Sequence, residues 1–281
     1  RLQGVQVKFV VYDLLCVLLP QYFVPGAADG FTGWLDVVAE NDGALCISQA
    51  VAADLSSWLA THAPDRARSF EIDRFHLGAD IENFATSSEI PRDGSKMLQH
   101  LRDAPTFLMV GTLEPRKGHA QVLDAFEQLW RDNRNVNLVV VGRQGWMVEE
   151  LVARLRAHTE QGRHLFWLEN ASDVYLEKIY GASSCLVAAS YGEGFGLPLI
   201  EAAQHGLAII ARDLPVFREV AGEHAFYFSA QDGRELATEI DAWLELRARQ
   251  QEPSSRGMPF LTWAQSARQL AKILMRDEAY S

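Results

Sequence analysis

The run Ser190-Tyr-Gly-Glu-Gly-Phe-Gly-Leu-Pro-Leu-Ile-Glu201 is the most informative part of this 281-residue sequence. It follows an apolar run, residues 185–189, that predicts a buried strand, and it leads into residues 197–206, which predict a helix ended by Gly206. A strand–loop–helix junction is where open α/β sheets bind ligands. Closely spaced glycines let the backbone approach a ligand, and the N–H groups at a helix start favour an anion such as a phosphate. The sequence therefore predicts an anion-binding loop.

Two carboxylates, Glu193 and Glu201, stand in this run with seven residues between them. Each would repel a phosphate unless it faced another part of the ligand, such as hydroxyl groups. A sugar attached to a nucleoside diphosphate offers phosphates in the middle and hydroxyls at both ends. The spacing alone is common by accident, and the alternative is a solvated loop glutamate and a surface helix glutamate. The glycines and the strand–helix context favour the ligand.

The composition bounds the class of protein. The chain is 48% hydrophobic and 22% charged, as is usual for a globular protein, and its length allows one large or two modest domains. A net charge of −11 argues against a general nucleic-acid or membrane-surface binder, because both need a basic face. It does not exclude a local basic pocket for phosphates.

The cysteines and the N-terminal apolar run bear on the compartment. Cys16, Cys46 and Cys185 are widely spaced in apolar runs, which favours buried free thiols in a reducing compartment over disulfides or a metal site. The run of residues 5–24 contains Asp13 and Pro20, and its longest uninterrupted apolar stretch, Leu14–Leu19, has only six residues, which is too short to span a membrane. The run also lacks a signal-peptide layout. We expect a cytoplasmic protein, and association with the inner face of the membrane through an acceptor is compatible with this.

From residue 106 onward, strand-like runs alternate with helical segments. The predicted strands are residues 106–110, 136–141, 164–168, 185–189, 207–211 and 226–228. Such alternation predicts a doubly wound parallel sheet. The fold class is therefore α/β, with one complete Rossmann-like lobe in this part of the chain.

The first part of the chain has fewer such units. Strands are expected at residues 7–12, 44–47 and 70–77, with helices at residues 31–40 and after Ser48, a good N-cap. Residues 81–105 are polar and broken by prolines and a glycine, so they are the candidate linker. Residues 261–275 predict a final helix.

A second motif, Gly111-Thr-Leu-Glu-Pro-Arg-Lys-Gly-His119, follows the first strand of the regular lobe. Arg116 and Lys117 would lie at the carboxyl edge of the sheet, where they can reach a diphosphate held by the loop of Gly194, Phe195 and Gly196. A cation on a leaving diphosphate can lower the barrier by about 2–4 kcal/mol. A solvated basic helix start is the alternative, and the helix dipole disfavours it.

Both motifs resemble the retaining nucleotide-sugar glycosyltransferases of family 4, which have the two-lobed GT-B fold. The run Glu-Gly-Phe-Gly-Leu-Pro with a second glutamate after seven residues, and the run Glu-Pro-Arg-Lys-Gly, carry the resemblance. It implies that Glu193 contacts the donor sugar, that Glu201 binds the ribose hydroxyls, and that Arg116 and Lys117 grip the pyrophosphate. Within this family, the sequence resembles the bacterial O-antigen and polysaccharide mannosyltransferases.

Other residues are weaker candidates for this donor site. Gly111 would let its loop approach the donor, Leu197 opens the helix, and Gly142-Arg143 would form a nucleotide wall. Tyr12 and Asp13 end a strand where many relatives carry a histidine that reaches the donor sugar, so that role is in question. His76 is expected to be a packed strand histidine, and Ser172 or Asp173 a helix N-cap.

The resemblance also implies domains and chemistry. We expect a partial N-terminal, acceptor-side lobe over residues 1–95, the donor-binding lobe over residues 96–252, and a crossover helix over residues 253–281. Because this N-terminal lobe is shorter than a complete one, we expect either a fragment of a longer polypeptide or an unusually short N-terminal lobe. The sequence contains no Asp-x-Asp, so we expect no metal or other cofactor, with Arg116 and Lys117 supplying the positive charge. The substrates would be a nucleoside-diphosphate hexose, GDP-mannose or another, and a glycan or lipid-linked acceptor.

Two other functions remain open at this point. A non-catalytic or truncated nucleotide-sugar-binding module of a larger glycosyltransferase would bind the donor without turnover. A GT-B phosphorylase would need a lysine bound to a pyridoxal cofactor, and a sugar-nucleotide epimerase shares the fold, but no feature of the sequence demands either.

Overall fold

The computed structural model describes residues 5–62, 69–79, 90–91 and 93–275. The chain divides into two compact units. The first comprises Arg1–Asp80, Gly192–Gly196 and Phe260–Ser281, and the second comprises Ile81–Tyr191 and Leu197–Pro259. The domain boundaries expected near residues 95 and 252 stay a prediction.

The second unit is built on a parallel sheet of six strands in the order β6-β5-β4-β7-β8-β9. These strands are β4 (Thr106–Val110), β5 (Asn137–Val141), β6 (Leu165–Leu168), β7 (Cys185–Ala188), β8 (Ala208–Arg212) and β9 (Phe226–Phe228). Counted from β4, the order is the 3-2-1-4-5-6 order of dinucleotide-binding folds. The six strands predicted from the sequence are confirmed to within one residue at either end.

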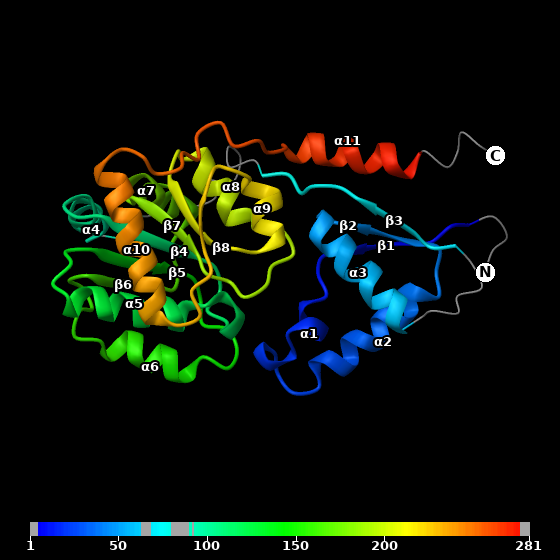
Figure 1. The fold of residues 1–281 in the computed structure, drawn as a ribbon, viewed down its shortest axis with the longest axis horizontal. Helices are drawn as coiled ribbons and strands as arrows, with labels where there is room; N and C mark the ends of the chain where they lie inside the picture. Colours follow the sequence, from blue (N-terminus) through cyan, green and yellow to red (C-terminus); the bar gives the residue numbers. More distant parts are fainter. Residues whose placement is uncertain (1–4, 63–68, 80–89, 92, 276–281) are drawn as a thin grey trace. The chain divides into compact units, whose positions relative to one another are not determined.

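Helices cover both faces of this sheet (Figure 1). They are α4 (Gly94–Arg102), α5 (His119–Arg131), α6 (Glu149–Ala157), α7 (Asp173–Ala182), α8 (Leu197–Gln204), α9 (Pro215–Ala221) and α10 (Gly233–Ala248), with a short 3₁₀ turn, η2 (Pro115–Lys117), before α5. Helices α5 and α10 pack on each other. Their contact with the sheet is centred on Phe107, whose ring meets Phe126 and Trp243 edge-on at centroid distances of 5.3 and 5.4 Å. All three rings are fully buried, so this aromatic cluster is the centre of the core.

The expected linker over residues 81–105 is wrong in its second half, because helix α4 lies there. Its overall composition is polar, but Leu98 and Leu101, three residues apart, are buried on one face. That face packs against α7, where the Tyr175 hydroxyl donates to Met97 Sδ at 3.3 Å. The start of the expected linker, residues 81–89, and residue 92 lie outside the described residues.

The first unit contains a parallel sheet of three strands in the order β1-β2-β3. The strands are β1 (Lys8–Val11), β2 (Gly43–Cys46) and β3 (Glu71–Arg74), and the helical elements are α1 (Leu15–Leu18), η1 (Pro20–Tyr22), α2 (Ala27–Ala39), α3 (Gln49–His62) and α11 (Trp263–Leu274). Strand β3 is shorter than predicted. The N-cap at Ser48 is confirmed, since Ser48 Oγ accepts a hydrogen bond from Val51 N at 3.1 Å.

The C-terminal helix α11 belongs to this first unit through contacts with the segment after β3 (Figure 1). Ala79 N donates to Leu261 O at 2.9 Å, and Ser266 Oγ donates to His76 O at 2.6 Å. The helix starts with a capping box, in which Thr262 and Gln265 each accept a backbone hydrogen bond from the other. Helix α11 is thus fixed to the segment that leaves β3.

Two further properties concern the whole chain. In the part that the structure describes, no helix combines the length and apolarity that crossing a bilayer requires. Cys16, Cys46 and Cys185 are buried free thiols, as the sequence predicts. Burial raises the pKa of Cys46 to about 12, with the nearby Asp54 carboxylate adding to the effect, so this thiol is held in its protonated form.

Gly78 allows the contact between the β3 exit and α11, which leads to a stability prediction. A Cβ at residue 78 would overlap the backbone of Trp263 and lie 2.7 Å from the carbonyl carbon of Thr262. We expect Gly78→Ala to displace the start of α11 and to lower the free energy of unfolding by about 1–3 kcal/mol in urea denaturation. Limited proteolysis should then cut near α11 sooner.

The matched control is Gly33→Ala in helix α2, where nothing lies within 4 Å of an added Cβ. Alanine in place of glycine inside a helix should stabilise the protein by about 0.5–1 kcal/mol. If the two variants had equal stability, the role given to the Gly78 contact would be wrong.

Candidate donor site and relatives

The loops that follow β4 and β7 meet at the carboxyl edge of the six-stranded sheet. The two strands are neighbours, with Leu108 opposite Leu186, and the strand order reverses between them. Beyond the strands, Tyr191 N donates to Arg116 O at 2.8 Å, which ties the loop after β7 to the basic loop after β4. This is the topological switch point, where ligands bind in open α/β folds.

Lys117, Gly111 and Gly142 lie together at this edge. Gly111 N donates to Val141 O at 2.9 Å, and a Cβ on Gly142 would overlap Gly111 O, so only glycine allows the two loops to approach this closely. The Lys117 side chain passes over the open side of Gly111, with Cε 3.9 Å from the position that a Cβ there would take. The structure therefore brings a lysine over a glycine backbone, as a phosphate site needs.

The neighbouring arginines differ from each other. Arg116 is largely buried, and its Nε lies 3.1 Å from Glu114 Oε2, in an ion pair whose carboxylate is also buried. Arg143 is exposed, and its backbone O accepts a hydrogen bond from Leu113 N at 2.8 Å. Where the sequence predicted a nucleotide wall, Gly142 makes a tight backbone contact with Gly111, and the Arg143 side chain that follows is exposed to solvent.

Glu201 lies in the second turn of α8, whose first residue is Leu197. Its Oε2 accepts a 2.8 Å hydrogen bond from the Tyr180 hydroxyl, and the Tyr180 ring stacks on His205 at a centroid distance of 4.8 Å. Burial raises the pKa of Glu201, an effect that the hydrogen bond from Tyr180 opposes. Burial, with the adjacent Glu201 charge, also raises the pKa of Tyr180, which keeps its proton on the shared bond.

The glycine-rich loop Gly192–Gly196 is part of the first unit. Ser48 Oγ donates to Gly194 O at 2.8 Å, and a Cβ on Gly194 would overlap Tyr12 O. Asp13 packs on the same glycine, and its Oδ1 accepts a 3.0 Å hydrogen bond from Leu15 N, at the start of α1. Within this unit, the Tyr12 backbone and the Asp13 Cβ therefore lie against the loop, as neighbours of the residues predicted to hold the donor.

The side chains near this loop have distinct surroundings. Phe195 is buried, and the His76 ring meets it edge-on at a centroid distance of 5.2 Å. His76 therefore lies in the segment that follows β3, not in a strand, and its ring packs against the glycine-rich loop. The Tyr12 side chain is 59% exposed, which does not resemble a packed aromatic at a strand end. Gly196 has a positive φ of 100° just before α8 begins.

Three residues near the candidate site escaped the sequence analysis. Glu114 pairs with Arg116, Tyr180 holds Glu201, and His119 is buried at the first residue of α5. Only Glu114 and His119 lie inside a motif that the sequence singled out, and Tyr180 stands 21 residues from its partner with no local signal. Among the described residues, no group of three or more His, Cys, Asp or Glu side chains could hold a metal ion.

His119 leads to a prediction on the pH dependence of stability. Burial first, and then the nearby Lys117 charge, lower the pKa of His119 to about 3. Below pH 6.5 the unfolded chain binds a proton that the folded protein excludes, so the free energy of unfolding falls as the pH drops from about 6.5 towards 3. At pH 5 this loss is about 2 kcal/mol.

Urea denaturation at pH 7.5 and pH 5 measures this loss. We expect His119→Leu to lose less stability than the wild type over this range, and the exposed His62→Gln to lose as much as the wild type. An unchanged pH dependence in His119→Leu would contradict the assignment.

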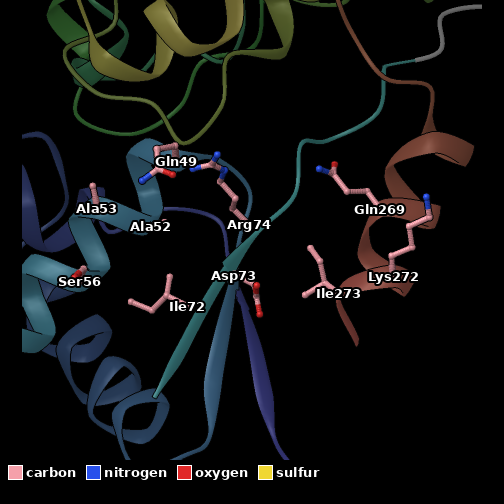
Figure 2. A pocket seen from close by; sticks show the side chains of 10 residues that line it. All are labelled: Gln49, Ala52, Ala53, Ser56, Ile72, Asp73, Arg74, Gln269, Lys272 and Ile273. Carbon is pink, nitrogen blue, oxygen red and sulfur yellow. The ribbon is translucent and has the colours of Figure 1, made fainter. Parts of the chain in front are cut away.

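A separate cavity of about 640 Å³ lies within the first unit, between α3, β3 and α11 (Figure 2). Ala52, Ala53, Ile72 and Ile273 supply apolar lining, and polar side chains of the three elements surround them, namely Gln49, Ser56, Asp73, Arg74, Gln269 and Lys272. Figure 2 shows Arg74 on one side of this space and Gln269 and Lys272 on the other. Such a lining provides hydrogen-bond donors and acceptors to a polar ligand.

Solved structures with the same architecture establish the fold. The crystal structure of Anabaena Alr3699/HepE in complex with UDP and glucose superposes with a TM-score of 0.70 at 20% identity, over 96% of this chain and 72% of that chain. Sucrose-phosphate synthase from Thermosynechococcus elongatus gives a TM-score of 0.72 at 19% identity, over 98% of this chain and 69% of that chain. The protein is therefore an α/β protein of the GT-B glycosyltransferase fold class.

The family is shown by the sequence of residues 95–258. The family model described as glycosyl transferases group 1 matches residues 95–258, more than half of the chain. The chain belongs to this family. The match contains the basic loop at residues 116–117, the glycine-rich loop and Glu201.

A curated relative extends the similarity to nearly the whole chain. The serotype-specific mannosyltransferase WbdA of Escherichia coli is 44% identical over 279 residues, which are 98% of this chain but only 34% of WbdA. The chain thus spans about a third of the length of this relative.

Proposed function

We propose that this chain carries the donor-binding and catalytic part of a retaining glycosyltransferase. It would move a hexose from a nucleoside-diphosphate sugar to a glycan or lipid-linked glycan in the synthesis of a surface polysaccharide such as an O-antigen. Mannose from GDP-mannose is the favoured donor, because WbdA and other relatives are named mannosyltransferases. The observation that carries the proposal is the bond between the basic loop and Tyr191, in the segment after β7, at the switch point of the second unit.

We assign the donor nucleotide to residues of the second unit. We assign the ribose hydroxyls to Glu201, because Tyr180 occupies Oε2 and no other described residue hydrogen-bonds this carboxylate. Lys117 is assigned to the diphosphate, because its side chain passes over the half-buried Gly111, with Cε 3.9 Å from the position of an added Cβ. Gly142 shapes the nucleotide site through its close backbone contact with Gly111. Leu197 begins the helix whose N-terminus favours a phosphate. Arg143 is a peripheral contact.

Glu193, Gly194, Phe195 and Gly196 are assigned to the donor sugar and diphosphate, with Tyr12 and Asp13 beside them. In the proposed reaction the bond between the anomeric carbon and the diphosphate oxygen breaks, and the acceptor hydroxyl forms a bond on the same face. The leaving phosphate accepts the hydroxyl proton, so no protein general base is needed. Glu193 positions the sugar, and Arg116 and Lys117 stabilise the charge that develops on the leaving diphosphate.

No metal ion or other cofactor is required in this scheme, because the cations of the basic loop take the place of a divalent metal on the diphosphate. Titration calorimetry with GDP, UDP, dTDP and ADP in EDTA tests the proposal. Saturable binding of one nucleotide supports it and identifies the donor class. If none binds to the folded protein, with or without a divalent metal, the donor-site proposal is wrong.

Substitutions separate the roles of Glu201 and Lys117. We expect Glu201→Gln to weaken nucleoside diphosphate binding by about 10-fold or more, while inorganic pyrophosphate binding is unchanged. Lys117→Met should weaken both ligands and reduce turnover by about 100-fold, a larger factor than its effect on the KM of the intact donor.

The control for Lys117→Met is Lys178→Met, which removes an exposed lysine of α7. It should leave both binding and turnover unchanged. Equal effects of Glu201→Gln on nucleotide and pyrophosphate, or full turnover in Lys117→Met, would contradict the assignment. Nucleotide binding without any transfer from a donor sugar would favour the alternative, a non-catalytic binding module of a larger glycosyltransferase.

We further propose that the cavity of Figure 2 holds part of the acceptor glycan. Its amide and charged side chains can hydrogen-bond sugar hydroxyls, and its apolar lining can pack against a sugar ring. Lys272→Met and Arg74→Met should each raise the KM for a mannose-terminated oligosaccharide about 5-fold or more, since a hydrogen bond to a charged group contributes about 1.5–3 kcal/mol.

The KM for the donor should not change in these variants, which a steady-state assay with each substrate varied would measure. Arg268→Met is the matched control, because Arg268 is exposed on the same helix and does not line the cavity. An unchanged acceptor KM in both cavity variants would place the acceptor elsewhere.

A further inference from the structure

A second cavity lies in the second unit, at the edge of the sheet opposite to the candidate donor site. Its volume is about 440 Å³. Ser183 and Ser184 line it just before β7, and Leu207 lines it just before β8, so it faces the amino ends of these parallel strands. The end of α10 and residues 252–256 complete its walls. No part of the donor site proposed above lines this cavity.

Two guanidinium groups give the cavity a positive character. Arg247 Nη1 donates to Ser184 O at 3.2 Å, and Arg256 lies over Gly206, with Nε 3.3 Å from the position of an added Cβ. Among the described residues neither arginine forms an ion pair, although the protein has a net charge of −11. Among the described residues of the lining, Glu252 is the single carboxylate. Unneutralised guanidinium groups at one cavity favour an anion, and phosphate in particular.

Two polar atoms of the lining are buried without a partner. Ser255 is 1% exposed, and neither its Oγ nor His205 Nε2 makes a hydrogen bond to any described residue. Buried polar groups in folded proteins are almost always hydrogen-bonded. A ligand with hydroxyl groups would supply the missing partners, and the Glu252 carboxylate could accept from a further hydroxyl. The lining therefore fits an anion and several hydroxyls in one small molecule.

The cavity is also connected to Glu201. His205 and Tyr180 both line it, and their rings stack nearly parallel, at an interplanar angle of 7°. The Tyr180 hydroxyl donates to Glu201 Oε2 at 2.8 Å. A ligand that fixes His205 would restrict the Tyr180 ring and, through the hydrogen bond, the carboxylate. This is a direct chain of contacts from the cavity to the proposed ribose-binding residue.

We propose that this cavity binds a phosphorylated monosaccharide and that its occupancy strengthens nucleotide binding through Tyr180 and Glu201. The phosphoryl group lies at Arg247 and Arg256, and the sugar hydroxyls meet Ser255, His205 and Glu252. The binding part is independent of the proposed function, whereas the coupling part rests on the assignment of Glu201 to the nucleotide. Coupling between two sites is reciprocal, so each ligand raises the affinity for the other by the same factor.

Calorimetry with mannose 6-phosphate, mannose and inorganic phosphate tests the binding part. We expect mannose 6-phosphate to bind saturably, and each of the other two at least 10-fold more weakly. Arg256→Gln should weaken mannose 6-phosphate binding at least 10-fold. Arg249→Gln should not, because Arg249 is exposed, pairs with Glu245 at 3.6 Å and lies outside the cavity.

Three results would overturn the binding part. They are no binding of mannose 6-phosphate, equal binding in Arg256→Gln and the wild type, and phosphate binding as tight as that of the sugar phosphate. The last of these would define a general anion site rather than a site for a phosphorylated sugar.

The coupling part is tested by titrating GDP with and without saturating mannose 6-phosphate. We expect the sugar phosphate to raise GDP affinity about 5-fold in the wild type. Tyr180→Phe, which removes only the hydroxyl, should still bind mannose 6-phosphate but show no such increase. A fall in GDP affinity would mean that the sugar phosphate competes at the donor site, and an equal increase in Tyr180→Phe would exclude the Tyr180 route; either result overturns the proposal. If none of GDP, UDP, dTDP and ADP binds, the donor-site proposal fails, while the mannose 6-phosphate titration still decides the binding part.

Discussion

The buried guanidinium of Arg212, at the end of β8, holds the second unit together at the edge where the candidate site lies. It donates to Ala189 O at 3.2 Å, to Ala230 O at 3.0 Å and to Gln121 Oε1. The ring of Tyr191 covers it at 4.2 Å, and the Tyr191 hydroxyl donates to the same Gln121 oxygen. A buried cation is costly unless it is fully hydrogen-bonded. The segments that follow β7 and β9 and the first turns of α5 are therefore fixed around one side chain.

This constraint prepares the site without using the residues that would touch a ligand. Tyr191 is the last residue before the glycine-rich loop, and its N–H is bonded to Arg116 O. The guanidinium of Arg212 thus fixes the bond between Tyr191 and the basic loop within the second unit, and the tight contact of Gly142 with Gly111 fixes the other side of the basic loop. Charges and N–H groups that are held in place before a ligand binds stabilise developing charge without a cost of reorganisation.

The sequence predicted most of this fold because the relevant signals are local. Apolar runs gave the six strands of the second unit to within one residue, and side-chain capping gave the helix starts at Ser48 and Ser172. Helix α4 was missed because its average composition is polar and only Leu98 and Leu101 carry its buried face. The motifs located the basic loop and Glu201, but contacts between residues far apart in the sequence could not be predicted from them. The pairing of Tyr180 with Glu201 and the role of Arg212 depend on how strands are ordered in space, which no spacing along the chain encodes.

The two cations of the basic loop are not equivalent, and the ion pair within the loop decides their roles. Glu114 lies 3.1 Å from Arg116 and is itself buried, so much of the positive potential of Arg116 is offset before any ligand arrives. That pair also fixes the turn η2, which leads into α5. Lys117 extends instead along Gly111, with its Cε 3.9 Å from the position that a Cβ on this glycine would take. We therefore expect Lys117 to carry most of the charge stabilisation on a leaving diphosphate, and Arg116 to hold the loop in the shape that lets Lys117 do so.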